Sequence, residues 1–249
     1  MNMPIAVKVF GLLAEDAYNP GNLGYPIFDK ILPQGGWNGF QAVAYILGSG
    51  VVVAFRGTQP KSAGGKGDLL ADLALGAGAN SDYFSAGERF VALVQERRKV
   101  VAVCGHSLGG AIAQVVGNRM NLPIVTFNAP GVAVLASRNI AAASNAGTQI
   151  RVTGMIASAA VYPGQAIRDM KAAFRPVSGL NIRLEADPVS QVGIHYGEIR
   201  TVPQTSFEGL EKGKYIEAGL GPVDRRLAAH GIDTVNKVLK VSAVGAEVI

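Results

Sequence analysis

A serine flanked by glycines lies where an apolar run of the sequence gives way to a run of small residues. The segment Gly105-His106-Ser107-Leu108-Gly109 fits the pattern G-x-S-x-G, in which a strained strand-to-helix turn presents the serine hydroxyl as a nucleophile. The glycines are needed because a β-carbon at either position would collide with the neighbouring strand or helix. A tight turn that merely contains a serine is the alternative. With a strand before it and a helix after it, the segment predicts covalent catalysis by Ser107.

A serine hydroxyl is a weak nucleophile, so Ser107 needs a base, and the base needs an acid that orients it. In elbows of this kind the three residues follow the chain order serine, acid, histidine. The chain has three histidines. His106 lies on the elbow itself and points the wrong way to act as the base, which leaves His195 and His230 as candidates.

The acid candidate is Asp187, which follows a short apolar run and precedes a proline that fixes the turn. Glu185 is its competitor, and an aspartate before proline is often only a turn residue. His230 lies 43 positions after Asp187 and precedes a glycine and a helix, so a loop could present it. His195 lies much nearer to Asp187, at the start of an expected strand, and could be a structural residue beside the site. The spacing favours His230 as the base, with a surface helix cap as its alternative role.

The expected elements around the elbow alternate between apolar strands and helices. Such alternation is typical of an α/β fold with a mostly parallel sheet and helices on both faces. The expected strands are 40–47 and 51–55 (a hairpin), 99–104, 124–128, 181–184 and 195–202. The expected helices are 5–18, 68–75, 85–95, 111–120, an alanine-rich stretch after 131, 165–174 and 233–241, and residues 19–39 are expected to form turns.

Composition excludes several classes of protein. Apolar residues make up 49% of the 249 residues and charged residues only 16%, which excludes a disordered chain. The 32 glycines have no period of three, so they indicate tight turns in a compact fold rather than collagen. No linker divides the chain, which predicts a single domain over residues 1–249. The net charge of +5 is scattered, so we expect no nucleic-acid partner, whereas an attraction to anionic lipid surfaces stays open.

The cysteine count and the first residues bear on the compartment and on cofactors. Cys104 is the single cysteine, so an intrachain disulfide or a multi-cysteine metal site is excluded. Residues 1–16 make a poor Sec signal peptide. We therefore expect a cytoplasmic protein, or one exported without a cleavable Sec signal, and no metal or organic cofactor. The sequence does not determine the oligomeric state.

Taken in order along the chain, six segments resemble the class 3 lipases, the fungal-type branch of the α/β hydrolases. The six segments cover about residues 40–235. They are Phe55-Arg56-Gly57-Thr58, Gly105-His106-Ser107-Leu108-Gly109-Gly110-Ala111, Phe127-Asn128-Ala129-Pro130, Asp187-Pro188-Val189, His195-Tyr196-Gly197-Glu198 and His230-Gly231-Ile232-Asp233. The resemblance implies a single-domain α/β-hydrolase fold.

The resemblance also implies roles for individual residues. Ser107 would be the nucleophile, Asp187 the acid and His230 the base. The backbone N–H groups of Thr58 and Leu108 would hold the oxyanion, with the Thr58 hydroxyl as a third donor. Asp72, which looks like an aspartate of the helix after the lid, would be structural.

Two segments depart from the family pattern. The stretch 59–67, where the family has an amphipathic lid, is polar and rich in glycine, which argues against interfacial activation. Residues 149–178 look longer than the usual connection and could form a cap over an acyl pocket, or could simply add to the core.

These features favour a serine carboxylester hydrolase that acts on lipid esters, a lipase or phospholipase, through an acyl-enzyme. Its partners would be a lipid or a small acyl-ester substrate, with transient contact to a lipid interface. An esterase, thioesterase or acyltransferase for soluble acyl esters is the alternative among enzymes, favoured by the small polar segment 59–67. A non-catalytic hydrolase-like binding module is the alternative from another class, and the complete serine, aspartate and histidine set argues against it.

Overall fold

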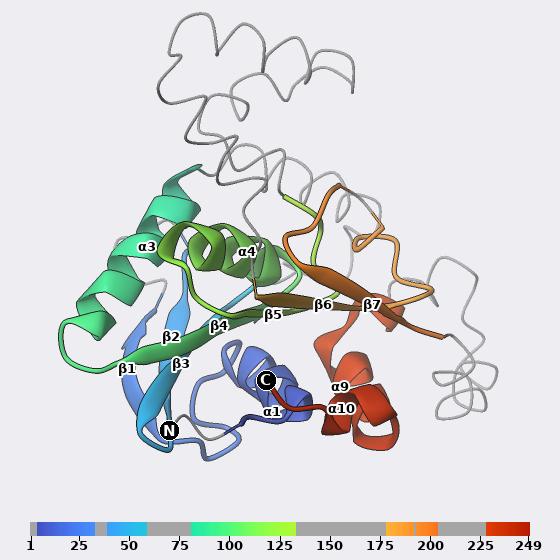
Figure 1. Cartoon of the computed structure of the whole chain (residues 1–249), viewed down its shortest axis with the longest axis horizontal. Coiled ribbons are helices and arrows are strands. Elements are labelled where there is room, and N and C mark those ends of the chain that lie inside the picture. Colours follow the sequence, from blue (N-terminus) through green and yellow to red (C-terminus); the bar gives the residue numbers. More distant parts are fainter. Residues whose placement is uncertain (1–3, 33–38, 59–80, 133–177, 192, 204–227) are drawn as a thin grey trace, which may run out of the picture.

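One twisted sheet organises the part of the chain that the structure describes, which is residues 4–32, 39–58, 81–132, 178–191, 193–203 and 228–249 of a computed structural model. Seven strands of the described residues form this sheet in the order β1-β2-β3-β4-β5-β6-β7 (Figure 1). They are β1 (Ile27–Ile31), β2 (Ala42–Leu47), β3 (Gly50–Phe55), β4 (Val100–His106), β5 (Ile124–Phe127), β6 (Gly179–Leu184) and β7 (Glu198–Val202).

The sheet is mostly parallel. Strands β1, β2 and β3 pair antiparallel, and every pairing from β3 to β7 is parallel. In β3 all six residues are buried, as expected for a strand that is covered on both faces. The predicted α/β class with a mostly parallel sheet is therefore confirmed, and so is the hairpin, in which Leu47 faces Gly50.

Helices cover both faces of the sheet (Figure 1). On one face lie α3 (Ser81–Gln95) and α4 (Leu108–Met120), and on the other lie α1 (Val7–Asp16) and α9 (Ile232–Val241), which is followed by the short α10 (Ala243–Ala246). The side chains of β3 alternate between the two faces. Val53 and Phe55 pack in the cluster under α3 and α4, and Val52 and Ala54 pack in the cluster under α1 and α9. This alternation divides the apolar core into two layers.

Several expectations about element positions differ from the structure. Helix α4 begins at Leu108 rather than residue 111, and β7 begins at Glu198, so His195 precedes this strand instead of starting it. Residues 27–31 form β1, a strand that the turn-rich pattern of 19–39 did not predict. This edge strand carries Asp29 and Lys30 and is only partly buried, so its apolar pattern is weak. Helix α3 begins at Ser81 rather than residue 85. Several expectations lie outside the described residues: the helices at 68–75, after 131 and at 165–174, Asp72, the segment 59–67 and, except for its last residue, the cap 149–178.

Candidate active site

The turn that carries Ser107 has the strained geometry of a nucleophile elbow. Strand β4 ends at His106, α4 begins at Leu108, and Ser107 between them has φ 57° and ψ −128°. A positive φ is uncommon for a residue with a side chain and is typical of functional turns. A β-carbon on Gly105 would collide with the backbone of Gly109, and one on Gly109 would collide with the Phe55 carbonyl. The two glycines therefore allow β4, α4 and the end of β3 to approach one another closely.

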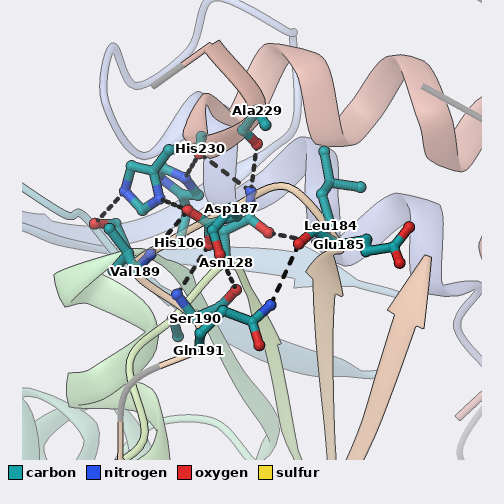
Figure 2. Close-up of polar contacts among 12 residues, drawn as sticks. His106, Asn128, Leu184, Glu185, Asp187, Val189, Ser190, Gln191, Ala229 and His230 are labelled. Carbon is teal, nitrogen blue, oxygen red and sulfur yellow. Dashed lines mark hydrogen bonds and ion pairs between the residues drawn. The ribbon is translucent and has the colours of Figure 1, made fainter. Parts of the chain in front are cut away.

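The structure brings Ser107, His230 and Asp187 together in one hydrogen-bonded series. His230 Nε2 lies 2.8 Å from Ser107 Oγ. On the other side of the ring, His230 Nδ1 lies 2.9 Å from Asp187 Oδ1 (Figure 2). A carboxylate only accepts, so Nδ1 carries the proton and Nε2 is free to accept the proton of the Ser107 hydroxyl. All three residues are buried, with His230 only 6% exposed. This is the arrangement that a base needs in order to activate a serine.

Asp187 is held as an ionised acceptor although it is fully buried. Its two carboxylate oxygens accept the backbone N–H groups of Val189 at 3.2 Å and Ser190 at 3.0 Å. Burial alone would raise its pKa. The hydrogen bond and charge of His230, together with the hydrogen bonds from Ser190, outweigh burial and hold the pKa of Asp187 below its ordinary value. Asp187 can therefore stabilise a positive charge on His230.

His106 uses both ring nitrogens away from Ser107. Its Nε2 lies 2.6 Å from the His230 carbonyl oxygen, which can only accept, so Nε2 donates. Its Nδ1 then accepts the Tyr18 hydroxyl at 2.9 Å. Burial, and next the charge of the nearby His230, lower the pKa of His106 to about 3. His106 is thus a neutral donor to the backbone of His230, as well as the residue that precedes the nucleophile.

The competing candidates lie apart from Ser107. His195 Nε2 donates to the Ala129 carbonyl at 2.8 Å, and burial lowers the pKa of this histidine. Glu185 is exposed to solvent, whereas Asp187 is buried against His230. The geometry therefore groups Ser107 with Asp187 and His230, and it does not bring His195 or Glu185 to the hydroxyl.

The end of β3 lies directly against the elbow. A β-carbon added to Gly57 would stand 2.7 Å from the His106 carbonyl oxygen and 3.2 Å from Ser107 Cβ. Thr58 follows Gly57 and is exposed, while Leu108 opens α4 and is buried. The two residues expected to hold the oxyanion therefore stand on the two segments that meet at Ser107, and their role stays a prediction.

Two residues of the site were missed in the sequence. Tyr18, just after α1, donates to His106, and its hydroxyl lies beside Gly57. Asn128, just after β5, has a positive φ of 45° and hydrogen-bonds the segment that carries His230. Asn128 lies in the segment Phe127-Asn128-Ala129-Pro130 that carries the resemblance, but the sequence predicted no role for it. Tyr18 had no signal, because its partners lie far away along the chain.

Within the described ranges, no group of three histidine, cysteine, aspartate or glutamate side chains is placed to hold a metal ion. Cys104 lies buried in β4, and burial raises the pKa of its thiol.

None of the described helices is both long enough and apolar enough to cross a membrane.

Comparison with known proteins identifies a family. A family model described as a Tle-like phospholipase domain matches residues 23–172, more than half of the chain, including Ser107 but not Asp187 or His230. No curated protein matches the chain.

Two solved esterases are similar at 14% identity. Carboxyl esterase 2 from the mycorrhizal fungus Tuber melanosporum has a TM-score of 0.34 and covers 84% of this chain and 86% of its own. An esterase from Pyrobaculum calidifontis has a TM-score of 0.31, with 95% and 91% covered. The family model shows the expected resemblance at the level of lipase-like ester hydrolases, and the finer assignment to class 3 lipases is not shown.

Proposed function

The chain belongs to the family of Tle-like phospholipase domains, and we propose that this serine ester hydrolase cleaves the acyl ester bonds of phospholipids through an acyl-enzyme. The observation that carries the proposal is the series Ser107–His230–Asp187 on a strained elbow, with 2.8 Å and 2.9 Å between successive side chains. The family match supports the substrate class. The hydrogen-bonded series supports the acyl-enzyme route.

The proposed reaction begins at the Ser107 hydroxyl. His230 Nε2 takes the hydroxyl proton while Oγ attacks the acyl carbonyl, and Asp187 stabilises the imidazolium that forms. The N–H groups of Thr58 and Leu108 hold the negative oxygen of the tetrahedral intermediate. His230 then protonates the departing lysophospholipid alcohol. Water activated by the same base releases the fatty acid and restores the free serine.

The main rival is a hydrolase of water-soluble acyl esters or thioesters with the same residues. Both enzymes would need Ser107 and His230, so they differ in substrate rather than in mechanism. A p-nitrophenyl ester series of increasing acyl length, run beside phospholipid vesicles, separates them. Preference for short soluble esters, with no release from vesicles, would replace the phospholipid substrate by a soluble one.

The test of the function uses three variants and product analysis. Ser107→Ala and His230→Ala should each lower kcat by at least about 10³-fold, whereas His195→Ala should keep activity because His195 bonds only a backbone carbonyl in the described contacts. The expected products are fatty acid and lysophospholipid. Full activity in Ser107→Ala would disprove the serine mechanism, and release of a phosphorylated head group would show cleavage at phosphate instead.

A further inference from the structure

The backbone of the proposed base is held by side chains that take no part in the proton transfers. Asn128 Nδ2 lies 2.8 Å from the Ala229 carbonyl oxygen and 3.2 Å from the His230 carbonyl oxygen (Figure 2). His106 Nε2 lies 2.6 Å from the same His230 oxygen. Three hydrogen bonds therefore converge on two consecutive carbonyl groups at the base. We propose that Asn128 is a positioning residue that fixes His230 relative to Ser107 and Asp187; this inference rests on the proposed function.

The orientation of the Asn128 amide follows from its partners. Its Oδ1 lies 2.9 Å from the backbone nitrogen of Leu184, which is a donor, and its Nδ2 faces two carbonyl oxygens, which only accept. Exchanging the oxygen and nitrogen would place like groups against each other at all three contacts. The side chain is fully buried, and both polar atoms are satisfied. Because a buried amide without partners is destabilising, these three contacts fix the orientation of the side chain.

Asn128 stands where the segments of all three proposed catalytic residues meet. The backbone N–H of Ser107 bonds the carbonyl of Phe127, the residue before Asn128, at 3.0 Å. Leu184, which bonds the Asn128 amide, accepts the N–H of Asp187 through its own carbonyl at 3.0 Å. Asn128 therefore links the strand beside the nucleophile, the turn of the acid and the segment of the base.

The backbone of Asn128 is strained in a way that supports this role. Its φ of 45° lies in the left-handed region, which asparagine tolerates better than most residues. The turn directs the amide toward both β6 and the His230 segment instead of continuing β5. Strain of this kind is found where surrounding contacts determine the conformation.

The physical consequence is a base held within reach of the hydroxyl. His230 transfers a proton only if Nε2 stays near the 2.8 Å seen to Ser107 Oγ. A displacement of about 1 Å at such a site can cost about 10²-fold in rate. Releasing the two carbonyl groups should therefore lower kcat, while KM, set by contacts to the acyl chain and head group, should change little.

The matched control is Asn181, another buried asparagine with three hydrogen bonds. Its Oδ1 accepts the Thr126 hydroxyl at 2.7 Å, and its Nδ2 donates to the carbonyls of Tyr196 at 2.6 Å and Glu198 at 3.2 Å. None of these partners is a proposed catalytic residue. Asn128→Gly and Asn181→Gly thus remove the same kind of buried amide, and glycine also tolerates the positive φ at position 128.

We expect folded Asn128→Gly to lose about 10- to 100-fold in kcat with KM within about twofold of wild type. The rate at which a sulfonyl fluoride inactivates Ser107 should fall by a similar factor. Asn181→Gly should lower the melting temperature but keep both rates. Equal kcat in the two folded variants would overturn the inference.

Asn128→Asp provides a second test if the glycine variant does not fold. The carboxyl group keeps the size and the acceptor for Leu184, but when ionised it faces two carbonyl oxygens with no proton to donate. Its kcat relative to wild type should therefore decline as the pH rises and the new carboxyl ionises. A constant ratio across pH would contradict the role. Full activity of Ser107→Ala would instead reject the proposed function. The two failures are therefore distinguishable, because only the Asn128 variants test the positioning role.

Discussion

Two buried side chains at the centre of the site, Asp187 and His106, differ in how their charge is controlled. Asp187 is kept ionised by donors that outweigh its burial, and its pKa stays below the ordinary value. His106, in contrast, is kept neutral, with a pKa lowered to about 3 by burial and by the charge of His230. A neutral His106 can donate to the His230 carbonyl without placing a second positive charge beside the proposed base. Each side chain therefore has the ionisation state that its contact requires.

The neutral state of His106 has a consequence for stability in acid. In the unfolded chain a histidine binds a proton below about pH 6.5, whereas folded His106 binds one only near pH 3. The unfolded state thus binds more protons between these values, so the contribution of His106 is complete above about pH 6.5 and is lost as the pH falls. We expect a loss of about 2 kcal/mol from this residue between about pH 7 and about pH 5.

Urea unfolding of wild type and His106→Gln at the two pH values measures this contribution. The free energy of unfolding should fall less steeply with acidification in the variant. An identical pH slope in both proteins would show that His106 is protonated equally in the folded and unfolded states.

Sequence patterns identified the grouped side chains but not those that hold them. Ser107 was indicated by its glycines, and Asp187 and His230 by chain order and by resemblance. Asn128 lies in a segment that carries the resemblance, but neither its role nor that of Tyr18 could be predicted, because their hydrogen bonds join residues about a hundred and about ninety positions apart. Such contacts depend on the three-dimensional approach of segments, which residue types along the chain do not specify.

At the scale of elements, the site depends on the close approach of β3 to the turn between β4 and α4. A β-carbon on Gly57 would meet the Tyr18 hydroxyl, the His106 carbonyl oxygen and Ser107 Cβ, so only glycine fits there without a shift. The hairpin and the buried strands of this region were predictable because their apolar runs are continuous. Edge strand β1 was not, because a partly exposed strand with two charged residues lacks such a run.

Gly57→Ala should separate the end of β3 from the elbow. The added methyl group would collide with the Tyr18 hydroxyl and would meet the His106 carbonyl oxygen at 2.7 Å. The backbone must therefore shift, and the Thr58 N–H would move with it. Losing one oxyanion donor costs about 10²–10³-fold in kcat, and we expect a loss of this order. Gly179→Ala is the control, since its methyl group would meet the Tyr196 carbonyl at 3.0 Å, away from the elbow. Equal kcat in the two variants would argue against an oxyanion site at Thr58.

At the scale of the whole molecule, the sheet brings residues from distant parts of the sequence to one edge. Ser107 follows β4, Asn128 follows β5 and Asp187 follows β6, so three parallel strands deliver their carboxyl ends to one place. This is where ligands bind in open α/β sheets. A mostly parallel sheet was predictable from the alternation of apolar strands and helices. Because the carboxyl ends of parallel strands lie together, the grouping of residues that follow these strands was predictable as well.

The net charge of +5 is a property of the whole chain. A basic protein concentrates at anionic surfaces through interactions that salt screens. We expect tighter binding to vesicles that contain phosphatidylglycerol than to pure phosphatidylcholine vesicles at low salt, with the difference lost near 1 M salt. A sedimentation assay with the inactive Ser107→Ala protein measures binding without hydrolysis. Equal binding to both vesicles at low salt would remove charge as a contributor to the lipid contact.

The central claim is that Ser107 forms an acyl-enzyme with His230 as its base. Mass spectrometry of protein quenched during turnover of a p-nitrophenyl ester measures this directly. The account predicts an added acyl mass on the peptide that contains Ser107, absent in Ser107→Ala and greatly reduced in His230→Ala. An acyl group on another residue, or turnover by Ser107→Ala at the wild-type rate, would contradict it.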